Sequence, residues 1–393
     1  MRPNMTLRVQ GPTVYVDANP LSEKYLTGIG RYTARICFAL AARGARVRFF
    51  AHDRELLPPR GLDWSQDQDL GRWGTRVWQG GRIVPLAAVP DDAVGLWTCT
   101  RPCKRTFPVE FSILYDLTPL IVPFTHEPQT QAQFQFFFAK SLLSSDAALA
   151  ISHSTKADAG WLSDFPQDRI VVAHSGPSQC LLRHLHDRHV TRRSNVGLVV
   201  STLEPRKNAN FLIDWFRSSK LLPDGTELWW VGRIGWLMSP RQLQGLQRGH
   251  RGRRIRLLGV VSDQQLCELY QTVGWSVYPS LYEGFGFPVL DSLRHGVPVL
   301  SSCNSSLREF AHPGVHFFDP HDAATLDQAW TECRAAGPNL VSKAQLDEHY
   351  NWDRVARAIL DMARGAQSAD CSRSHSREHL GAQAQWGSGA STE

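Results

Sequence analysis

The chain alternates short, nearly continuous apolar runs with stretches in which apolar residues recur every three or four positions. The short runs predict buried β-strands, and the periodic stretches predict amphipathic helices. Regular alternation of the two favours a parallel sheet covered by helices. In the first half we predict strands at residues 13–17, 46–51, 111–115 and 147–152, and helices at 32–43 and 130–143.

The alternation stops at residues 185–194, which carry few apolar side chains and have no regular period. A chain of 393 residues is long enough for two domains with separate cores. We therefore predict a Rossmann-like domain over residues 1–184 and a second, doubly wound domain over residues 195–350. In the second half the predicted strands are 196–202, 227–231, 255–258, 275–278 and 297–301, and the predicted helices are 209–218, 264–272 and 289–295.

Two Ser-x-x-Gln/Glu patterns mark helix starts in the second domain. Ser262 with Gln265, and Ser306 with Glu309, have the spacing of a capping box, in which two side chains satisfy free amides at a helix start. Both patterns therefore predict local helix caps.

The C-terminal end changes in character. Residues 352–362 have a helical period, and we predict a helix over residues 351–365 that packs back towards the first domain. Residues 366–393 are rich in Ser, Gly, Ala and Gln with scattered charge, which predicts a disordered tail.

The composition, 42% hydrophobic and 20% charged, is that of a soluble globular protein. The longest apolar runs are far shorter than the roughly 20 residues that cross a bilayer, and the N-terminus lacks the apolar core of a secretory signal. We therefore expect a cytoplasmic protein. The eight cysteines are scattered, which favours reduced thiols over a zinc site.

Basic residues gather at Arg101, Lys104 and Arg105, and again over residues 248–256. Such clusters suit phosphate groups, but a solvated charged face is an equally good interpretation. Since neither cluster has the aromatic interleaving of a nucleic-acid surface, we predict no nucleic-acid partner.

Residues 278–291 (YPSLYEGFGFPVLD) combine a strand end, a loop with two glycines and a helix start. Glu283 follows the carboxyl end of a parallel strand, where open α/β sheets bind ligands. Gly284 and Gly286 allow the backbone to approach a ligand closely. Asp291 could accept hydrogen bonds from a ribose diol, or it could only favour the dipole of a helix N-terminus.

Two further stretches follow strands in the same way. Arg206 and Lys207 come directly after the first strand of the second domain, where two cations can neutralise a diphosphate. Gly28, Gly30 and Arg31 follow the first strand of the chain, although a lone Gly-x-Gly is a weak signal.

Residues 115–116 and 151–156 also lie at predicted strand ends. Asp116 could orient a sugar or an acceptor, or it could only cap a loop. Ser152 and Ser154 could line a cleft, or Ser154 could only cap the next helix.

Together these stretches resemble the retaining GT-B glycosyltransferases of family 4, over most of residues 13–362. Residues 283–291 resemble that family's E-x7-E signature with Asp291 at the second acidic position, and residues 204–208 (EPRKN) resemble its diphosphate-binding motif. Many relatives have His-Asp where this chain has Tyr115 and Asp116, and the nearby His126 could supply that imidazole. The resemblance implies an α/β fold of two Rossmann-like domains that face each other across a cleft.

The resemblance also implies roles for these residues. Arg206, Lys207, Glu283 and Asp116 would be catalytic. The substrate would be bound by Gly28, Gly30, Arg31, Tyr115, Ser152, Gly284, Phe285, Gly286 and Asp291.

The implied reaction is transfer of a hexosyl group from a nucleoside-diphosphate sugar to a saccharide, without a metal or cofactor. GDP-mannose is the favoured donor, with rhamnosyl and glucosyl donors as alternatives, and a polyprenyl-diphosphate-linked saccharide is the favoured acceptor, in polysaccharide or lipopolysaccharide biosynthesis. A noncatalytic nucleotide-sugar-binding protein and another GT-B enzyme, such as an epimerase, remain as alternatives. Arg101, Lys104 and Arg105, with the aromatic residues Phe134 and 136–138, would allow peripheral contact with the inner face of a membrane. An equally good interpretation is that these aromatic residues all belong to the core.

Overall fold

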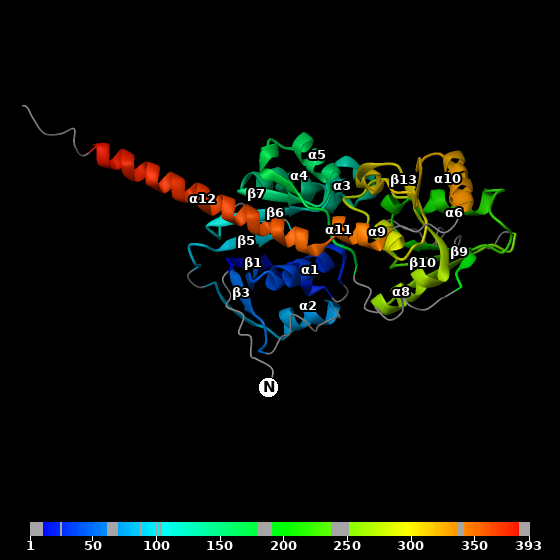
Figure 1. Cartoon of the computed structure of the whole chain (residues 1–393), viewed down its shortest axis with the longest axis horizontal. Helices are drawn as coiled ribbons and strands as arrows, with labels where there is room; N and C mark the ends of the chain where they lie inside the picture. The colour runs from blue at the N-terminus through cyan, green and yellow to red at the C-terminus, as the bar shows by residue number, and fades with distance from the viewer. Residues whose placement is uncertain are drawn as a thin grey trace, which may run out of the picture.

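The computed structural model describes residues 11–23, 26–60, 70–86, 89–99, 101, 104–178, 191–236, 251–336 and 342–384, with residues 369–384 described by their backbone alone. Two α/β domains lie side by side, and helix α12 (Trp352–Ala384) runs back from the second domain along the first (Figure 1). Within the described part of the chain, no helix is both long and apolar enough to cross a membrane.

The first domain is built on an eight-stranded sheet with the order β4-β3-β2-β1-β5-β6-β7-β8. Strand β3 pairs antiparallel with β2 and β4, and the other neighbours are parallel. Its central strands are buried on both faces, as expected of parallel strands covered by helices. The strands are β1 (Thr13–Asp17), β2 (Arg46–Ala51), β3 (Arg54–Leu57), β4 (Arg82–Pro85), β5 (Val94–Trp97), β6 (Val109–Leu114), β7 (Ala147–Ala150) and β8 (Ile170–Val172). The helices are α1 (Gly28–Ala42), α2 (Leu70–Gln79), α3 (Thr118–Ile121), α4 (Pro128–Leu143) and α5 (His153–Leu162), with 3-10 turns η1 (Asn19–Ser22), η2 (Pro123–Thr125) and η3 (Gln167–Arg169).

The second domain has a six-stranded, fully parallel sheet with the order β11-β10-β9-β12-β13-β14. This is the Rossmann order, in which ligands bind at the carboxyl ends of the central strands. The strands are β9 (Arg193–Val200), β10 (Glu227–Val231), β11 (Arg254–Gly259), β12 (Val273–Tyr278), β13 (Val299–Ser302) and β14 (Val315–Phe318). The helices are α6 (Ala209–Ser218), α8 (Asp263–Thr272), α9 (Phe287–Arg294), α10 (Ala323–Ala336) and α11 (Lys343–His349), with 3-10 turns η5 (Pro205–Lys207) and η6 (Ser305–Phe310).

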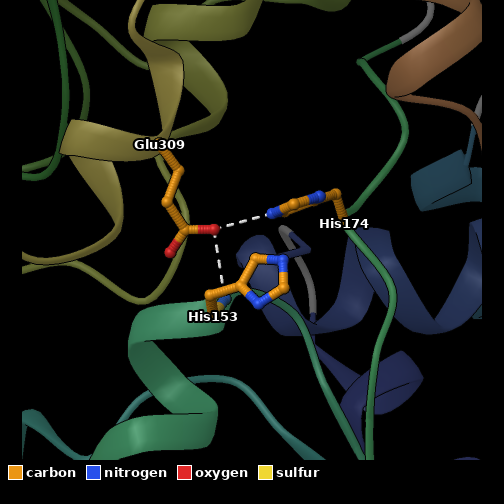
Figure 2. A group of neighbouring side chains, drawn as sticks. All are labelled: His153, His174 and Glu309. Atoms are coloured by element: carbon orange, nitrogen blue, oxygen red, sulfur yellow. Dashed lines mark hydrogen bonds and ion pairs between the residues drawn. The ribbon is translucent and has the colours of Figure 1, made fainter.

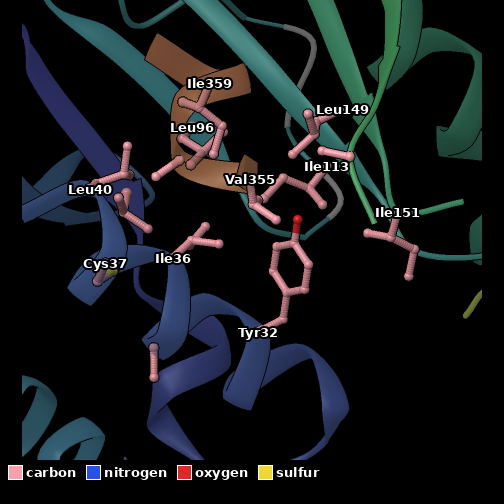
Figure 3. Packing of buried hydrophobic residues seen from close by; sticks show 14 of the residues in the cluster. Tyr32, Ile36, Cys37, Leu40, Leu96, Ile113, Leu149, Ile151, Val355 and Ile359 are labelled. Atoms are coloured by element: carbon pink, nitrogen blue, oxygen red, sulfur yellow. The ribbon is translucent and has the colours of Figure 1, made fainter. Parts of the chain in front are cut away.

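Helix α12 is part of the first domain's core, although it follows the second domain in sequence. Tyr32 and Ile36 of α1 lie in one buried cluster with Val355 and Ile359 of α12 (Figure 3). Each aliphatic side chain buried in this way contributes about 1.5–3 kcal/mol. The helix therefore ties the end of the second domain to the first.

The expectation of two doubly wound α/β domains is confirmed. The predicted strands 13–17, 46–51 and 227–231 and the helix 209–218 have the bounds found in the structure. The capping box of Ser262 and Gln265 is also present. Of the predicted linker, residues 185–190 lie outside the described residues.

Several details differ from the predictions, among them that β9 begins at Arg193, within the predicted linker. Helix α1 begins at Gly28 rather than at residue 32, because Thr27 caps it and the glycines form its first turn. Helix α12 continues to Ala384, so the backbone of residues 366–384 is helical rather than disordered, and residues 385–393 lie outside the described part. The expectation of reduced thiols is wrong for Cys267, which is disulfide-bonded, whereas Cys37, Cys303 and Cys333 are free thiols.

Candidate active site

Arg206 and Lys207 lie in η5, immediately after the carboxyl end of β9, and both contact Glu283. Arg206 Nη1 donates to Glu283 Oε2 at 2.7 Å, and its Nη2 donates to Glu204 Oε1 at 3.0 Å. Lys207 Nζ donates to Glu283 Oε1 at 2.5 Å and to the Tyr278 hydroxyl at 2.9 Å. Two cations and two carboxylates thus form one buried charged group at the carboxyl edge of the sheet.

Neighbouring charges determine the protonation state of Glu283. Burial alone would raise the pKa of Glu283, but Arg206 and Lys207 outweigh burial and lower that pKa to about 2. The Glu283 carboxylate is therefore charged at physiological pH, and it can only accept hydrogen bonds. Such a carboxylate can accept hydrogen bonds from hydroxyl groups.

Asp116 of the first domain lies against this group. Its negative charge helps to raise the pKa of Arg206, together with Glu283 and against the effect of burial. The Thr155 hydroxyl lies 3.2 Å from the carbonyl oxygen of Tyr115 and 3.3 Å from that of Gly284, so it bridges the two domains. The loops of residues 115–116 and 283–284 therefore meet at one point.

A pocket of about 340 Å³ opens between the domains, and its lining includes residues 200–202, which precede the loop that carries the charged group. It is lined by Gly28 and Arg31 of α1, by Ser178, by Asp291 of α9, and by strand ends and loops of the second domain. Arg206, Lys207 and Glu283 are not in its lining. The structure thus brings the expected site residues together as two neighbouring sets, a pocket and a charged group.

Asp291 is buried in the wall of this pocket. One carboxylate oxygen accepts the backbone N–H of Ser178 at 3.1 Å. The carboxylate lies beyond the first turn of α9, so the interpretation that it only favours the helix dipole is wrong. Burial raises its pKa to about 6, against the lowering effect of the hydrogen bond from Ser178.

This pKa predicts a pH dependence with opposite signs for binding and for stability. The folded pKa of about 6 lies above the ordinary value of 3.8, so the free energy of unfolding that Asp291 contributes is greatest below pH 3.8 and is lost as the pH rises to about 6. The charged carboxylate has two accepting oxygens for a ribose diol, whereas protonation turns one of them into a donor and weakens binding. We therefore expect the donor KM to rise as the pH falls through about 6. The Asp291→Asn variant should have a donor KM that changes little over this pH range. If the variant keeps the pH profile of the wild type, Asp291 does not bind the ribose.

Gly28 and Gly30, in the first turn of α1, have different surroundings. A Cβ at Gly28 would have no atom within 4 Å, whereas one at Gly30 would lie 2.7 Å from the carbonyl oxygen of Pro20. Gly28 therefore leaves space in the pocket, and Gly30 is required by the packing. Free amides at the start of this helix favour an anionic ligand.

We expect Gly28→Ala to fold normally and to raise the donor KM several-fold, because the methyl group is added at a residue that lines the pocket. Gly30→Ala serves as the matched variant and should lower the melting temperature, since its methyl group has no room. Steady-state kinetics and thermal denaturation of both variants make this comparison. Equal donor KM values for Gly28→Ala and the wild type would argue against a ligand at the start of α1.

Four other residues that we expect to contact the substrate also have contacts within the fold. The Tyr115 hydroxyl is buried, and its ring packs edge-on against Tyr32. Ser152 is fully buried and caps α5 by accepting the N–H of Thr155. Phe285 packs among aromatic rings, and Gly286, with φ of 125°, precedes α9. None of these four residues lines the pocket, and their contacts with a substrate stay a prediction.

Residues of both predicted basic clusters form ion pairs or hydrogen bonds within the protein. Arg101 is fully buried in an ion pair with Glu110, and Arg105 pairs with Asp146. Arg253 is buried and donates to main-chain carbonyls that include that of Ser219. The expectation of a basic membrane surface is therefore wrong for Arg101.

Glu309 forms a clasp between the domains, which we define as Glu309, His153 and His174 (Figure 2). Its carboxylate accepts the backbone N–H groups of Ser154 at 2.8 Å and His153 at 3.1 Å, and it lies 2.7 Å from His174 Nε2. The ligand atoms of the clasp lie within 4.8 Å of one another, which is a spacing that a metal ion could use. Both Glu309 oxygens, however, already accept hydrogen bonds at the positive end of α5, so the arrangement is that of a helix cap.

Sequence reasoning placed Glu309 in a local capping box with Ser306. In the structure Ser306 instead donates to the carbonyl oxygens of Glu283 and Phe285, and Glu309 caps a helix of the other domain. Glu204 was also missed as a partner of Arg206, although its position two residues away was the available signal.

Comparisons with known proteins agree with this geometry. Residues 194–334 match the family described as Glycosyl transferases group 1. The chain is 29% identical over 244 residues to O-antigen chain mannosyltransferase B of Escherichia coli, an alignment that covers 56% of this chain and 62% of that protein. It is 26% identical over 318 residues to serotype-specific mannosyltransferase WbdA of Escherichia coli, covering 74% of this chain and 37% of that protein. The chain thus spans less than two thirds of the length of either relative.

Among solved structures, sucrose-phosphate synthase of Thermosynechococcus elongatus superposes with a TM-score of 0.66 at 16% identity. That match covers 91% of this chain and 100% of the other. At such low identity the likeness concerns the fold alone. The fold is therefore GT-B, and within it residues 194–334 match the family described as Glycosyl transferases group 1.

Proposed function

We propose that the protein transfers a hexosyl group from a nucleoside-diphosphate sugar to a saccharide. The observation that carries this proposal is the meeting of Arg206, Lys207 and Glu283 with Asp116 of the other domain, next to an interdomain pocket. The group offers both cations for a diphosphate and a permanently charged carboxylate for sugar hydroxyls. These are the two halves of a nucleotide-sugar donor.

In the proposed reaction the acceptor hydroxyl bonds to the anomeric carbon, and the bond from that carbon to the diphosphate oxygen breaks. Arg206, Lys207 and the start of α1 stabilise the charge that develops on the departing diphosphate. Glu283 holds the donor hexose, and Asp291 holds the ribose. The hydroxyl proton leaves with the phosphate, and the anomeric configuration is retained.

Mannose from GDP-mannose is the proposed donor, because the relatives from Escherichia coli are mannosyltransferases. The proposed acceptor is a lipid-linked saccharide in the biosynthesis of a cell-surface polysaccharide. The name of the first relative, an O-antigen chain enzyme, supports this assignment.

A peripheral position at the inner face of a membrane is proposed on the exposed side of α4. Phe136, Phe137 and Leu143 are exposed there, and Lys140 lies 4.2 Å from the ring centroid of Phe136. Apolar side chains next to a cation give reversible attachment to anionic lipid.

A panel of GDP-, UDP- and dTDP-sugars tests the function. We expect GDP-mannose to raise the melting temperature and, with a lipid-linked saccharide fraction, to be consumed with release of GDP. A shift in melting temperature without release of any nucleoside diphosphate would identify a binding protein instead.

A further inference from the structure

An apolar platform lies where the loop after β10 meets η2 of the first domain. Gly235 packs so closely on residues 202–204 that a Cβ would lie 2.7 Å from Thr202 Cγ2. This packing holds the next residue, Trp236, between the two domains. Trp236 Nε1 donates to the carbonyl oxygen of Thr125 at 2.9 Å.

The platform consists of Phe124, Ile234 and Trp236. The Phe124 side chain is 71% exposed and that of Ile234 is 56% exposed, while Trp236 is partly buried. Large apolar side chains that are exposed where two domains meet are typical of a binding surface.

A short chain of contacts connects the platform to the charged group. The His126 ring stacks on Trp236 with centroids 6.1 Å apart, and its Nε2 lies 3.0 Å from the Thr118 hydroxyl oxygen. Thr118 in turn donates to Asp116 Oδ1 at 2.7 Å. Burial and the positive charge of Arg206 lower the pKa of His126. This series of contacts is therefore coupled electrostatically to the charged group.

Asp116 retains an accepting oxygen. The backbone N–H and the hydroxyl of Thr118 both donate to Oδ1, and no described residue donates a hydrogen bond to Oδ2. A carboxylate oxygen accepts hydrogen bonds from hydroxyl groups. A series of three contacts therefore links the apolar platform to an accepting oxygen.

This combination matches the chemistry of a pyranose. One face of such a ring is made of C–H groups that pack on apolar and aromatic side chains, and its edge carries hydroxyl groups that need acceptors. We propose that Phe124, Ile234 and Trp236 bind the terminal pyranose of the saccharide acceptor and that Asp116 accepts a hydrogen bond from its hydroxyl edge. This inference rests on the proposed function, because it names the acceptor side of the same site.

Binding of a mannose disaccharide, measured by saturation-transfer NMR with the whole protein, tests the platform without requiring transfer. The wild type should bind the disaccharide, and Phe124→Ala and Trp236→Ala should weaken binding about tenfold, as loss of an aromatic contact implies. Phe124→Trp, which keeps an aromatic ring at this position, should bind the disaccharide as the wild type does. Trp161→Ala, at an aromatic side chain that is 80% exposed on α5, is the matched control and should bind as the wild type does.

The shift in melting temperature with GDP should stay unchanged in both platform variants, which separates them from donor-site defects. Absence of binding to the wild type, or equal binding by Phe124→Ala and the wild type, would overturn the inference. If the variants lose the disaccharide but the wild type transfers no sugar, the platform stands and the proposed function fails.

Discussion

Arg206→Ala and Lys207→Ala should each lower kcat by about 10- to 100-fold, because a hydrogen bond to a charged group is worth about 1.5–3 kcal/mol and about 1.4 kcal/mol corresponds to tenfold in rate. Each change removes a cation that faces the diphosphate. It also leaves Glu283 with one partner fewer, so the melting temperature should fall as well. The kcat values are therefore compared per folded molecule, at a temperature below the thermal unfolding of both variants.

Arg101→Ala is the matched control for a buried arginine outside the site. Arg101 pairs with Glu110, and both side chains are fully buried. This variant should lose stability but keep the kcat of its folded fraction. If Arg206→Ala and Lys207→Ala kept activity within twofold of the wild type, the diphosphate assignment would be wrong.

Gly284→Ala should reduce kcat about 100-fold, because a displacement of about 1 Å in reacting groups is enough for such a loss. A Cβ at Gly284 would lie 1.8 Å from the carbonyl oxygen of Tyr115 and 2.8 Å from Asp116 Cβ. The added methyl group must therefore push the loop that contains Asp116 away from Glu283. The donor-induced shift in melting temperature should also decrease.

Gly365→Ala provides the control for this substitution. Gly365 lies in α12, and a Cβ there would meet no atom within 4 Å. The variant should be as active as the wild type and slightly more stable, since alanine favours a helix interior by about 1 kcal/mol over glycine. Wild-type kcat in Gly284→Ala would show that the two domains do not need this contact for the reaction.

The sequence was most informative where local pattern and burial agree. Strand β10 and helix α6 have the predicted bounds, because their apolar periods coincide with the faces that pack on the core. The Arg206, Lys207 and Glu283 group was also predictable, since each residue follows a strand whose carboxyl end must point to the cleft.

Contacts between the domains could not be predicted in this way. Glu309 has the spacing of a local cap, and only the position of α5 in the folded chain makes it a cap for another domain. Trp236 likewise had no signal in the local pattern, because its place depends on the close packing of Gly235. The helical backbone beyond residue 365 was missed because its composition resembles that of a disordered segment.

Transfer of radiolabelled mannose from GDP-mannose into a saccharide product, compared between the wild type and Arg206→Ala, tests the central claim most directly. The account predicts labelled product with the wild type and at least tenfold less per folded molecule of the variant, in line with the loss of about 1.5–3 kcal/mol from one charged contact. Equal incorporation by the two proteins, or no labelled product from the wild type with GDP-, UDP- or dTDP-sugars, would contradict it.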